Sequence, residues 1–590
     1  MPTNITDLQV LALDCQATGA NPRNGHLLEI GWLKTRAADT LSPGALPVKS
    51  HLAGLPEGVE IPPAVQRVTG ISMEALAKAL DPTDIWQKVF KTANEIAAVD
   101  QMDRCPTIIH YARFEAPFLR DLHAKSSRGN DFPLRIICTH EIAKRLLPGL
   151  PRRGLRAVAG YFGHSVPPSR RSADHAVATA VIWQNLLSQL ATDPGIRELD
   201  ELTDWLSRTT PQKRVGRVYP MEPEIRLGLP KKPGIYRMLR SNKDLLYIGK
   251  ATSLKQRVNS YFRRKGARAE HTLEMLSQAA GLEVTLTGSA LEAAVLESDE
   301  IKQHAPPYNV ALQKGQRKLA FLSRDLRKLS AEPDKTHCLG PFPAGNRTDA
   351  MTAFGSWHAN RRNLDRDEVL ELGTVLLGVP PAYAPEPDCL AEGMDLFGQH
   401  HLTQLARRSA LRTLSGLGRR LWQERLAELA VAQAEETEEN LEADSADSDP
   451  DIDEAPSWTP ETVARGIEKF TMRSGLLIRR ARWLCLLSES SLAWEARDAD
   501  DHRKIVLRLE NGAVARRLEL PRREEVPLPA GYARRMTDRQ KIFDLTTYER
   551  LRVITTELRR LVAGGRHIEI RLRPNATLSR RQLARILPWV

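Results

Sequence analysis

The sequence predicts a multidomain protein of the α/β and α+β classes, on three observations. A chain of 590 residues and 66.0 kDa is too long for one hydrophobic core. Strand-like and helix-like apolar patterns alternate over residues 7–190 and again over residues 233–310. An acidic, low-complexity tract at residues 435–456 then separates two further regions, and its composition predicts disorder.

Composition and charge narrow the class of partner. The net charge is +12, but eleven acidic residues and no Lys or Arg lie between Glu435 and Glu454. The rest of the chain has 85 basic and 62 acidic residues, and this excess of +23 favours binding to DNA. The acidic tract could mimic DNA and compete with it for the basic surfaces. No apolar run reaches the roughly 18 residues that span a membrane, and Met1–Asp14 has no signal-peptide pattern, so we expect a cytoplasmic protein without membrane contact. The six cysteines lack CxxC spacing, so we expect reduced, mostly buried thiols.

Apolar patterns predict the elements in order along the chain. Val10–Leu13 and Leu27–Leu33 are expected to form strands, and Asp84–Ala98 and Ala176–Leu190 helices. A linker rich in Pro, Lys and Arg follows. Beyond residue 310 the pattern is largely helical and begins with a turn at Gly340–Pro343.

The C-terminal part predicts a separate α+β domain with a basic surface. Asn511-Gly512 between alternating apolar flanks indicates a hairpin over Lys504–Leu520. Helical spacing from Leu551 ends at Gly564, and Ile568–Leu572 alternates like a strand. No motif in this part indicates chemistry.

The middle region carries the most specific pattern. Gly234-Ile235-Tyr236 and Tyr247-Ile248-Gly249 flank a turn at Ser241–Asp244, which predicts a hairpin with the two tyrosines close together. A helix opening at Ser253 carries Arg257 and places Tyr261 on the same face.

A second helix of this region, Ala290–Gln303, carries two glutamates. Glu297 follows an apolar run in which an unpaired carboxylate is costly, so the sequence favours a metal partner for it. Glu292 has no such surroundings and is expected at the surface. The region closes with Pro307-Tyr308-Asn309.

These residues resemble the GIY-YIG nuclease family, most closely the N-terminal domain of excinuclease C and the related excinuclease Cho. The resemblance implies that Glu297 holds one divalent metal ion, Mg²⁺ or Mn²⁺, and that Arg257 contacts the scissile phosphate. It assigns Tyr236 or Tyr247 to the deprotonation of water, which costs about 4 kcal/mol at neutral pH unless nearby cations lower the tyrosine pKa. The remaining residues of the implied site are Lys250, Tyr261 and Asn309.

The first region resembles the DnaQ-like 3′–5′ exonucleases, which have an RNase H-like fold. The resemblance rests on Leu11–Gly19, Leu28–Gly31, Val68–Ile71, His110–Glu115 and the helix Ala173–Leu187. Such enzymes hold two metal ions with four carboxylates.

The carboxylate set of the exonuclease-like region is incomplete. Asp14 is present, but Gln16 stands in place of a glutamate and the longer Glu115 in place of an aspartate. At the third motif His175 stands where aspartate belongs and Arg170 where the catalytic histidine belongs, while Asp174 lies one residue earlier, about 100° around a helix. His110 is expected to be structural. We therefore expect a retained fold that binds DNA ends or a partner in place of exonuclease activity, and that holds at most one weakly bound ion at Asp14 and Glu115.

The sequence as a whole predicts a DNA repair nuclease that cuts the damaged strand on the 3′ side of a lesion, with excinuclease damage-recognition subunits A and B. Leu339–Pro343 resembles the segment that follows the nuclease domain in excinuclease C, but neither the second nuclease domain nor the helix-hairpin-helix tandem of that family is found, which implies one incision. Two alternatives stay open: an exonuclease or proofreading accessory of DNA polymerase III, and a DNA-binding scaffold without catalysis. Basic pairs that suit phosphate contacts include Arg479-Arg480, Arg516-Arg517, Arg559-Arg560 and Arg580-Arg581.

The predicted domains are an RNase H-like exonuclease domain at 1–208, a linker at 209–229, a small GIY-YIG α/β domain at 230–312, a helical region at 313–432, the acidic linker at 433–457 and the C-terminal α+β domain at 458–590.

Overall fold

The computed structural model divides the chain into two compact units. Residues 1–293 and 300–313 form the first, and residues 294–299 and 314–590 form the second. The structure describes residues 4–39, 47–126, 131–212, 216–263, 269–309, 318–360, 365–379, 383–402, 409–432, 458–495 and 503–589. The predicted acidic tract lies outside these residues. None of the helices within them is long and apolar enough to cross a membrane.

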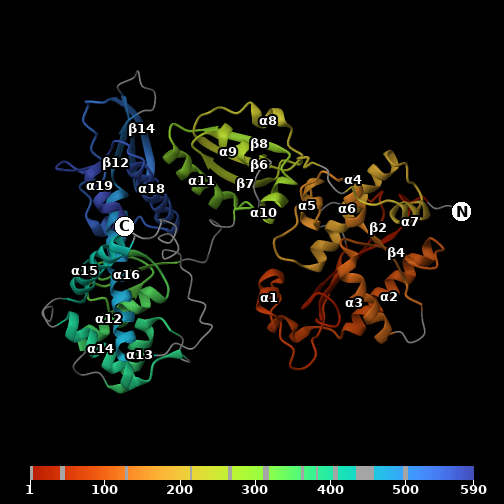
Figure 1. The fold of residues 1–590 in the computed structure, drawn as a ribbon, viewed down its shortest axis with the longest axis horizontal. Helices are drawn as coiled ribbons and strands as arrows, with labels where there is room; N and C mark the ends of the chain where they lie inside the picture. The colour runs from red at the N-terminus through yellow and green to blue at the C-terminus, as the bar shows by residue number, and fades with distance from the viewer. Residues whose placement is uncertain are drawn as a thin grey trace. The chain divides into compact units, whose positions relative to one another are not determined.

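The first unit opens with a five-stranded sheet of order β3-β2-β1-β4-β5 (Figure 1). β1 pairs antiparallel with β2 and parallel with β4, and β5 runs parallel to β4. Three antiparallel strands followed by two parallel ones give the RNase H-like arrangement, and the first two predicted strands are confirmed. The strands are β1 (Val10–Ala17), β2 (Leu27–Thr35), β3 (Lys49–Leu52), β4 (Cys105–Ile109) and β5 (Leu134–Cys138).

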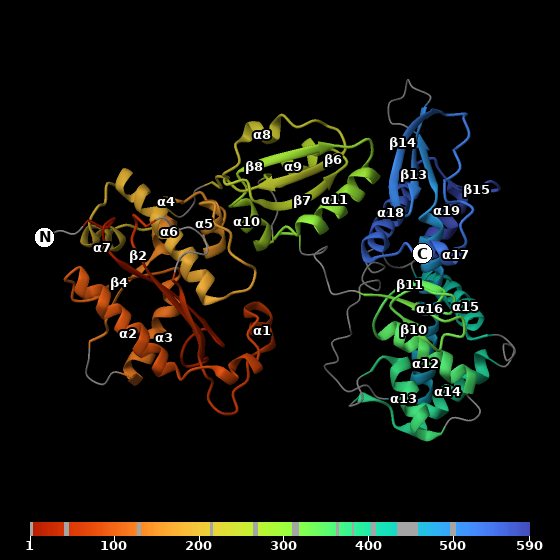
Figure 2. The same cartoon turned by 180° about the vertical axis from the view of Figure 1, so that it is seen from behind.

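Helices cover both faces of this sheet because its central strands are apolar on both sides. Val10 and Ala12 of β1 pack in one core with α6 (Ser172–Thr192). Leu11 and Leu13 point the other way and pack against α2 (Pro82–Val99) and α3 (Ala112–Ser126), which lie side by side (Figures 1 and 2). Side-chain alternation along β1 therefore turns Asp14 toward α6. The other helices are α1 (Pro63–Thr69), η1 (Glu74–Lys78), α4 (Thr139–Leu146), α5 (Leu155–Tyr161) and α7 (Leu199–Arg208).

The second half of the first unit is a small antiparallel sheet of order β7-β6-β8. β6 and β7 form the predicted hairpin, with Tyr236 opposite Gly249 and Met238 opposite Tyr247. β7 is the edge strand of this sheet, and Tyr308 and Asn309 hydrogen-bond to its outer side at Leu246 and Ile248. The elements are β6 (Gly234–Leu239), β7 (Leu245–Ala251), β8 (Gly281–Leu286), α8 (Pro223–Leu227), α9 (Leu254–Ser260), α10 (Glu270–Leu276) and α11 (Ala290–His304).

The second unit begins with a three-stranded sheet that the sequence did not predict. Its order is β10-β9-β11, and β11 (Leu339–Pro343) is the segment expected to be a turn. That expectation was wrong because Phe342 is buried and pairs with Ala320 of β9 (Leu319–Leu322), so apolar burial outweighs the local turn signal of Gly and Pro. The third strand is β10 (Leu329–Ser330).

A helical core follows this sheet, and its largest member is α16 (Pro460–Leu487). Val463, Ile467 and Ile478 of α16 pack in the same apolar cluster as Phe354 and Phe397. The core therefore crosses the predicted boundary at residue 458. The other helices are α12 (Asn346–Asn360), α13 (Arg366–Leu377), α14 (Pro387–His401) and α15 (Ala410–Ala432).

The C-terminal part is a five-stranded antiparallel sheet of order β14-β13-β12-β15-β16, with helices beside it. The hairpin predicted at Asn511-Gly512 is confirmed, and both turn residues have the positive φ angles that such a turn needs. The elements are β12 (Ser491–Glu495), β13 (Arg503–Glu510), β14 (Ala513–Pro521), α17 (Met536–Gln540), α18 (Leu545–Ala563), β15 (Ile568–Arg573), β16 (Ala576–Ser579), α19 (Arg580–Ile586) and η7 (Leu587–Trp589).

The cysteines agree with the expectation of reduced thiols. All six are free, and four of them are buried.

Candidate active site

Three tyrosines meet beside the edge strand β7. Tyr236 comes from β6, Tyr247 from β7 and Tyr261 from the end of α9. Their ring centroids lie 6.1 to 6.4 Å apart, and the hydroxyl groups of Tyr236 and Tyr261 are 2.9 Å apart, in hydrogen-bond contact. The hairpin and the following helix thus build one aromatic cluster, as the sequence predicted.

Gly249 makes this cluster possible. A Cβ atom on Gly249 would overlap the ring of Tyr236 and come within 2.8 Å of Tyr247 Cε1. The glycine is therefore required by the close approach of the two rings over β7, and not by the turn, which lies several residues earlier.

Arg257 joins the tyrosine cluster from α9. Its Nη2 donates to the hydroxyl of Tyr261 over 3.2 Å, and its guanidinium carbon lies 5.1 Å from the centre of that ring. The shared helix face predicted for Arg257 and Tyr261 is confirmed. Although burial alone would lower the pKa of Arg257, the three tyrosines raise it, so the side chain stays a cation.

The tyrosines differ in their access to water. Tyr236 is fully buried, whereas Tyr247 and Tyr261 are half-buried. Burial, followed by the neighbouring Tyr261 and Tyr247, raises the pKa of Tyr236 well above its ordinary value. Tyr236 therefore stays neutral and supports the cluster, which leaves Tyr247 as the better candidate for proton removal from water.

The exonuclease-like carboxylates lie in a second place, on the α6 side of the first sheet. Asp14 is almost fully buried, and both of its oxygens have partners. Gln16 Nε2 donates to Asp14 Oδ2 over 2.7 Å, and His175 Nδ1 lies 3.2 Å from Asp14 Oδ1. The two residues that replace carboxylates therefore occupy the oxygen atoms that a metal ion would use.

Glu115 is the second buried carboxylate of this region. It is 3% exposed, and its Oε2 has no hydrogen-bond partner among the described residues. Burial, followed by the charge of Asp14, raises its pKa well above the ordinary value, so the group is kept neutral.

His110, Asp174 and Arg170 do not complete an exonuclease site. His110 is buried between Thr139 Oγ1 at 2.9 Å and the carbonyl of Arg153 at 3.0 Å, so both of its nitrogens are used structurally. Asp174 is half-buried in the first turn of α6, and Arg170 is exposed before that helix. The structural role expected for His110 agrees with these contacts.

Comparison with known proteins assigns the middle region to a family. Residues 232–310 match the family described as the UvrC-like GIY-YIG domain. The chain contains a UvrC-like GIY-YIG domain. UvrABC system protein C of Psychrobacter sp. (strain PRwf-1) is 41% identical over 126 residues, which cover 20% of each chain. The GIY-YIG N-terminal endonuclease domain of UvrC from Thermotoga maritima, solved with magnesium as its catalytic divalent cation, is 33% identical, covers 15% of this chain and 99% of that chain, and has a TM-score of 0.14.

Other relatives extend beyond the GIY-YIG domain. A Mycobacterium tuberculosis (strain CDC 1551 / Oshkosh) protein, named as a bifunctional exonuclease/endonuclease, is 29% identical over 251 residues, which are 42% of this chain and 36% of that one. Exonuclease X, solved with 5′ overhanging duplex DNA, is 16% identical, covers 33% of this chain and 99% of that chain, and has a TM-score of 0.24. The chain thus spans about a third or less of the length of these curated relatives.

Lys250 and Asn309 of the GIY-YIG domain both lie at β7, the strand that carries Tyr247. Alternation along β7 turns Lys250 to the sheet face opposite Tyr247, and it is half-buried there. Asn309 uses both polar atoms of its side chain on Ile248: its Oδ1 accepts from the backbone N–H over 2.9 Å and its Nδ2 donates to the carbonyl over 2.8 Å. These contacts brace β7 beside Tyr247, and the part of Asn309 in the implied site stays a prediction.

The glutamates of α11 behave differently from one another. Glu292 accepts from the hydroxyl of Ser289 over 3.2 Å at the start of the helix, which agrees with the expected role outside the site. Glu300 binds Arg237 of β6 at 2.7 Å and so fixes the helix on the sheet. Glu297 is half-buried one turn before Glu300. Its part in holding a metal ion stays a prediction.

The sequence analysis gave no role to Glu29, the most firmly held carboxylate of the exonuclease-like region. Glu29 is 1% exposed and binds Arg171 at 2.6 Å, the N–H of Ser172 at 2.8 Å and the hydroxyl of Ser50 at 2.9 Å. Although burial alone would raise its pKa, these partners lower it, so Glu29 is charged and anchors the start of α6. A glutamate inside the apolar run of β2 was the signal available in the sequence, because such a position needs a partner.

Proposed function

We propose that this protein is a metal-dependent DNA endonuclease of nucleotide excision repair, acting through its GIY-YIG domain. The observation that carries the proposal is the contact chain from Arg257 through Tyr261 to Tyr236, beside the half-buried Tyr247 of β7. A cation and a water-accessible phenol at one sheet edge are the groups that phosphodiester hydrolysis requires.

The proposed reaction uses the residues in distinct roles. Tyr247 in its phenolate form takes a proton from water, the water oxygen bonds to phosphorus, and the bond from phosphorus to the 3′ oxygen breaks. The departing 3′ oxygen takes a proton from solvent water, which leaves a 3′-hydroxyl and a 5′-phosphate. Arg257 stabilises the charge on the phosphate oxygens, and Tyr261 and Tyr236 hold Arg257 in place. A divalent cation held by Glu297 would neutralise further charge on the phosphate.

The carboxylates of the GIY-YIG domain suit a site in which one carboxylate holds a single metal ion. They do not suit a site that holds two metal ions. Mg²⁺ at phosphate sites is often held by one or two carboxylates, with waters and the substrate completing its shell. Glu297 can supply one such carboxylate. No group of three His, Cys, Asp or Glu side chains among the described residues is placed to hold a metal ion. We therefore propose a single Mg²⁺ or Mn²⁺ at the GIY-YIG domain and none at Asp14.

The finer parts of the function rest on the resemblance to excinuclease C. We propose incision on the 3′ side of a lesion, after loading by the damage-recognition subunits A and B. The exonuclease-like domain would keep its fold without 3′–5′ activity, because Asp14 already has Gln16 and His175 as partners. The same contacts disfavour a proofreading role with DNA polymerase III.

The test is a nicking assay on a lesion-bearing duplex with the damage-recognition subunits A and B and Mg²⁺ or Mn²⁺. Glu297→Gln and Arg257→Ala should each slow nicking at least about 100-fold. Glu292→Gln, a carboxylate on the same helix, is the matched control and should leave nicking unchanged. Wild-type rates in the first two variants would refute the proposal. Stepwise shortening of single strands from the 3′ end that Asp14→Asn abolishes would favour the exonuclease alternative.

A further inference from the structure

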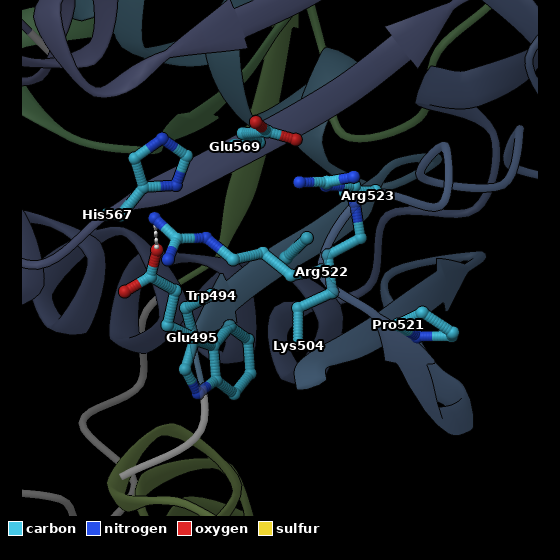
Figure 3. A pocket seen from close by; sticks show the side chains of 9 residues that line it. Trp494, Glu495, Lys504, Pro521, Arg522, Arg523, His567 and Glu569 are labelled. Carbon is cyan, nitrogen blue, oxygen red and sulfur yellow. Dashed lines mark ion pairs between the residues drawn. The ribbon is translucent and has the colours of Figure 1, made fainter. Parts of the chain in front are cut away.

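The C-terminal sheet contains a pocket that the proposed nuclease site does not use. It has a volume of about 640 Å³ and lies where β12, β13 and β15 meet the segment after β14. Figure 3 shows Arg522 reaching toward Glu495 beside the ring of His567, and Arg523 pointing toward Glu569. Arg522 and Glu495 form an ion pair at 2.7 Å.

Lys504 lines this pocket and is the unusual residue in it. It is 8% exposed, so more than nine-tenths of the residue is buried. Glu495 lies opposite Lys504 in the sheet but is engaged by Arg522. Among the described residues, the ammonium of Lys504 has no hydrogen-bond or ion-pair partner. Because Lys504 lines the pocket, an anion that enters the pocket can pair with its ammonium.

Further Lys and Arg side chains lie along the same β13–β14 hairpin, beyond the pocket. Residues 503–523 include seven Lys or Arg and two Glu. On the face that carries Lys504, Arg508 and Arg516 stand directly opposite each other in the β13–β14 register, and Glu510 pairs with Arg508 at 3.2 Å. Like charges in opposite positions repel each other unless an anion lies between them.

The lining excludes other kinds of ligand. A metal ion is disfavoured because Lys504, Arg522 and Arg523 outnumber the two carboxylates. Stacking of a base is disfavoured because Trp494 is 5% exposed and offers no free ring face. A phosphate group fits the remaining chemistry, since Lys and Arg bind it without reading sequence.

We propose that this pocket and the adjoining face of β13 and β14 bind a phosphate of the DNA backbone, with Lys504 as the buried contact. The proposal rests on the DNA-directed function proposed above and adds a second DNA contact, remote in sequence from the GIY-YIG domain. It gives the C-terminal part a role in holding DNA without base specificity.

The experiment measures binding of a short fluorescent duplex to the full chain over a range of salt, in EDTA so that no cleavage occurs. Lys504→Gln should weaken binding roughly tenfold and reduce the slope of log K against log salt by about 0.9, the value of one lost phosphate contact. Lys504→Arg should retain most of the affinity. The matched control is Lys541→Gln, which removes an exposed lysine paired with Asp538 and should change neither quantity.

The outcomes separate this proposal from the nuclease proposal, because binding in EDTA is independent of catalysis. Should Lys504→Gln fail to fold, Arg523→Gln on the exposed rim serves as the second variant, with the same expected direction. Wild-type affinity and slope in a folded Lys504→Gln protein would overturn the proposal. Thermal stabilisation by inorganic phosphate or dAMP that needs Lys504, together with unchanged duplex binding, would instead assign the pocket to a free phosphate compound and would also overturn it.

Discussion

At the residue scale, the structure of the tyrosine cluster gives different roles to Tyr236 and Tyr247, which the sequence alone could not distinguish. Both Tyr236 and Tyr247 follow from the same pair of tripeptides, and either could be the base. The structure distinguishes them by burial, since Tyr236 has no exposed surface and Tyr247 is half-buried. Burial depends on where α9 packs, and the pattern of the strands alone does not contain that information.

This difference gives the first prediction. Tyr247→Phe should reduce nicking about 100-fold or more because it removes the proposed base. Tyr236→Phe should reduce it only several-fold, by loss of one hydrogen bond to Tyr261. Single-turnover nicking rates measure both. Equal losses of nicking in the two variants would contradict the assignment.

His110 gives a prediction about stability and pH. Burial lowers its pKa from 6.5 to about 3, so the folded protein holds it neutral. Below pH 6.5 the unfolded chain gains a proton that the folded chain cannot accept, so the stabilisation present above pH 6.5 is lost as pH falls toward 3. At pH 5 the loss should be about 2 kcal/mol. Denaturant midpoints for wild type and His110→Gln measure it, and an equal acid sensitivity of the two proteins would contradict the prediction.

At the element scale, the hairpins were predictable and the packing of neighbouring segments was not. Asn511-Gly512 has a local turn signal, and the structure places the hairpin there. Gly340–Pro343 has an equally local signal for a turn, but it forms β11 because Phe342 enters a core built from residues far along the chain. Glu29 was missed for the same reason, since its partner Arg171 is distant in sequence.

Asn309 supports a prediction about the edge strand β7. Its side chain pairs with the backbone of Ile248 as a neighbouring strand would, between Tyr247 and Gly249. Asn309→Ala should leave two buried backbone groups without partners and destabilise the domain by about 2 kcal/mol. Nicking should fall while duplex binding in EDTA stays near wild type. Melting temperature, nicking and binding test this, and a loss of nicking without any loss of stability would instead indicate direct contact with the phosphate.

At the scale of the whole molecule, charge is distributed unevenly along the chain. The tract between Glu435 and Glu454 contains eleven acidic residues, and the rest of the chain has a net charge of +23. Deleting the tract should tighten duplex binding and make it more dependent on salt, because the acidic residues no longer compete for the basic surfaces. Replacement by an uncharged Gly/Ser segment of equal length is the control for chain length. Unchanged affinity in both variants would contradict competition by the tract.

The helix α16 limits where the chain can be divided into fragments that keep a complete hydrophobic core. Its 28 residues extend over about 42 Å, and its side chains serve two cores. Val463 and Ile467 complete the bundle formed with α14 and α15, whereas the indole of Trp483, further along, donates to Thr555 of α18. A fragment that ends before residue 458 would lack α16, the central helix of its own bundle. A fragment that begins at residue 458 would expose the apolar side chains of Val463 and Ile467 to water. After limited proteolysis, the fragments that carry α14 and α15 should therefore stay bound to the fragment that carries α16, which size-exclusion chromatography can measure.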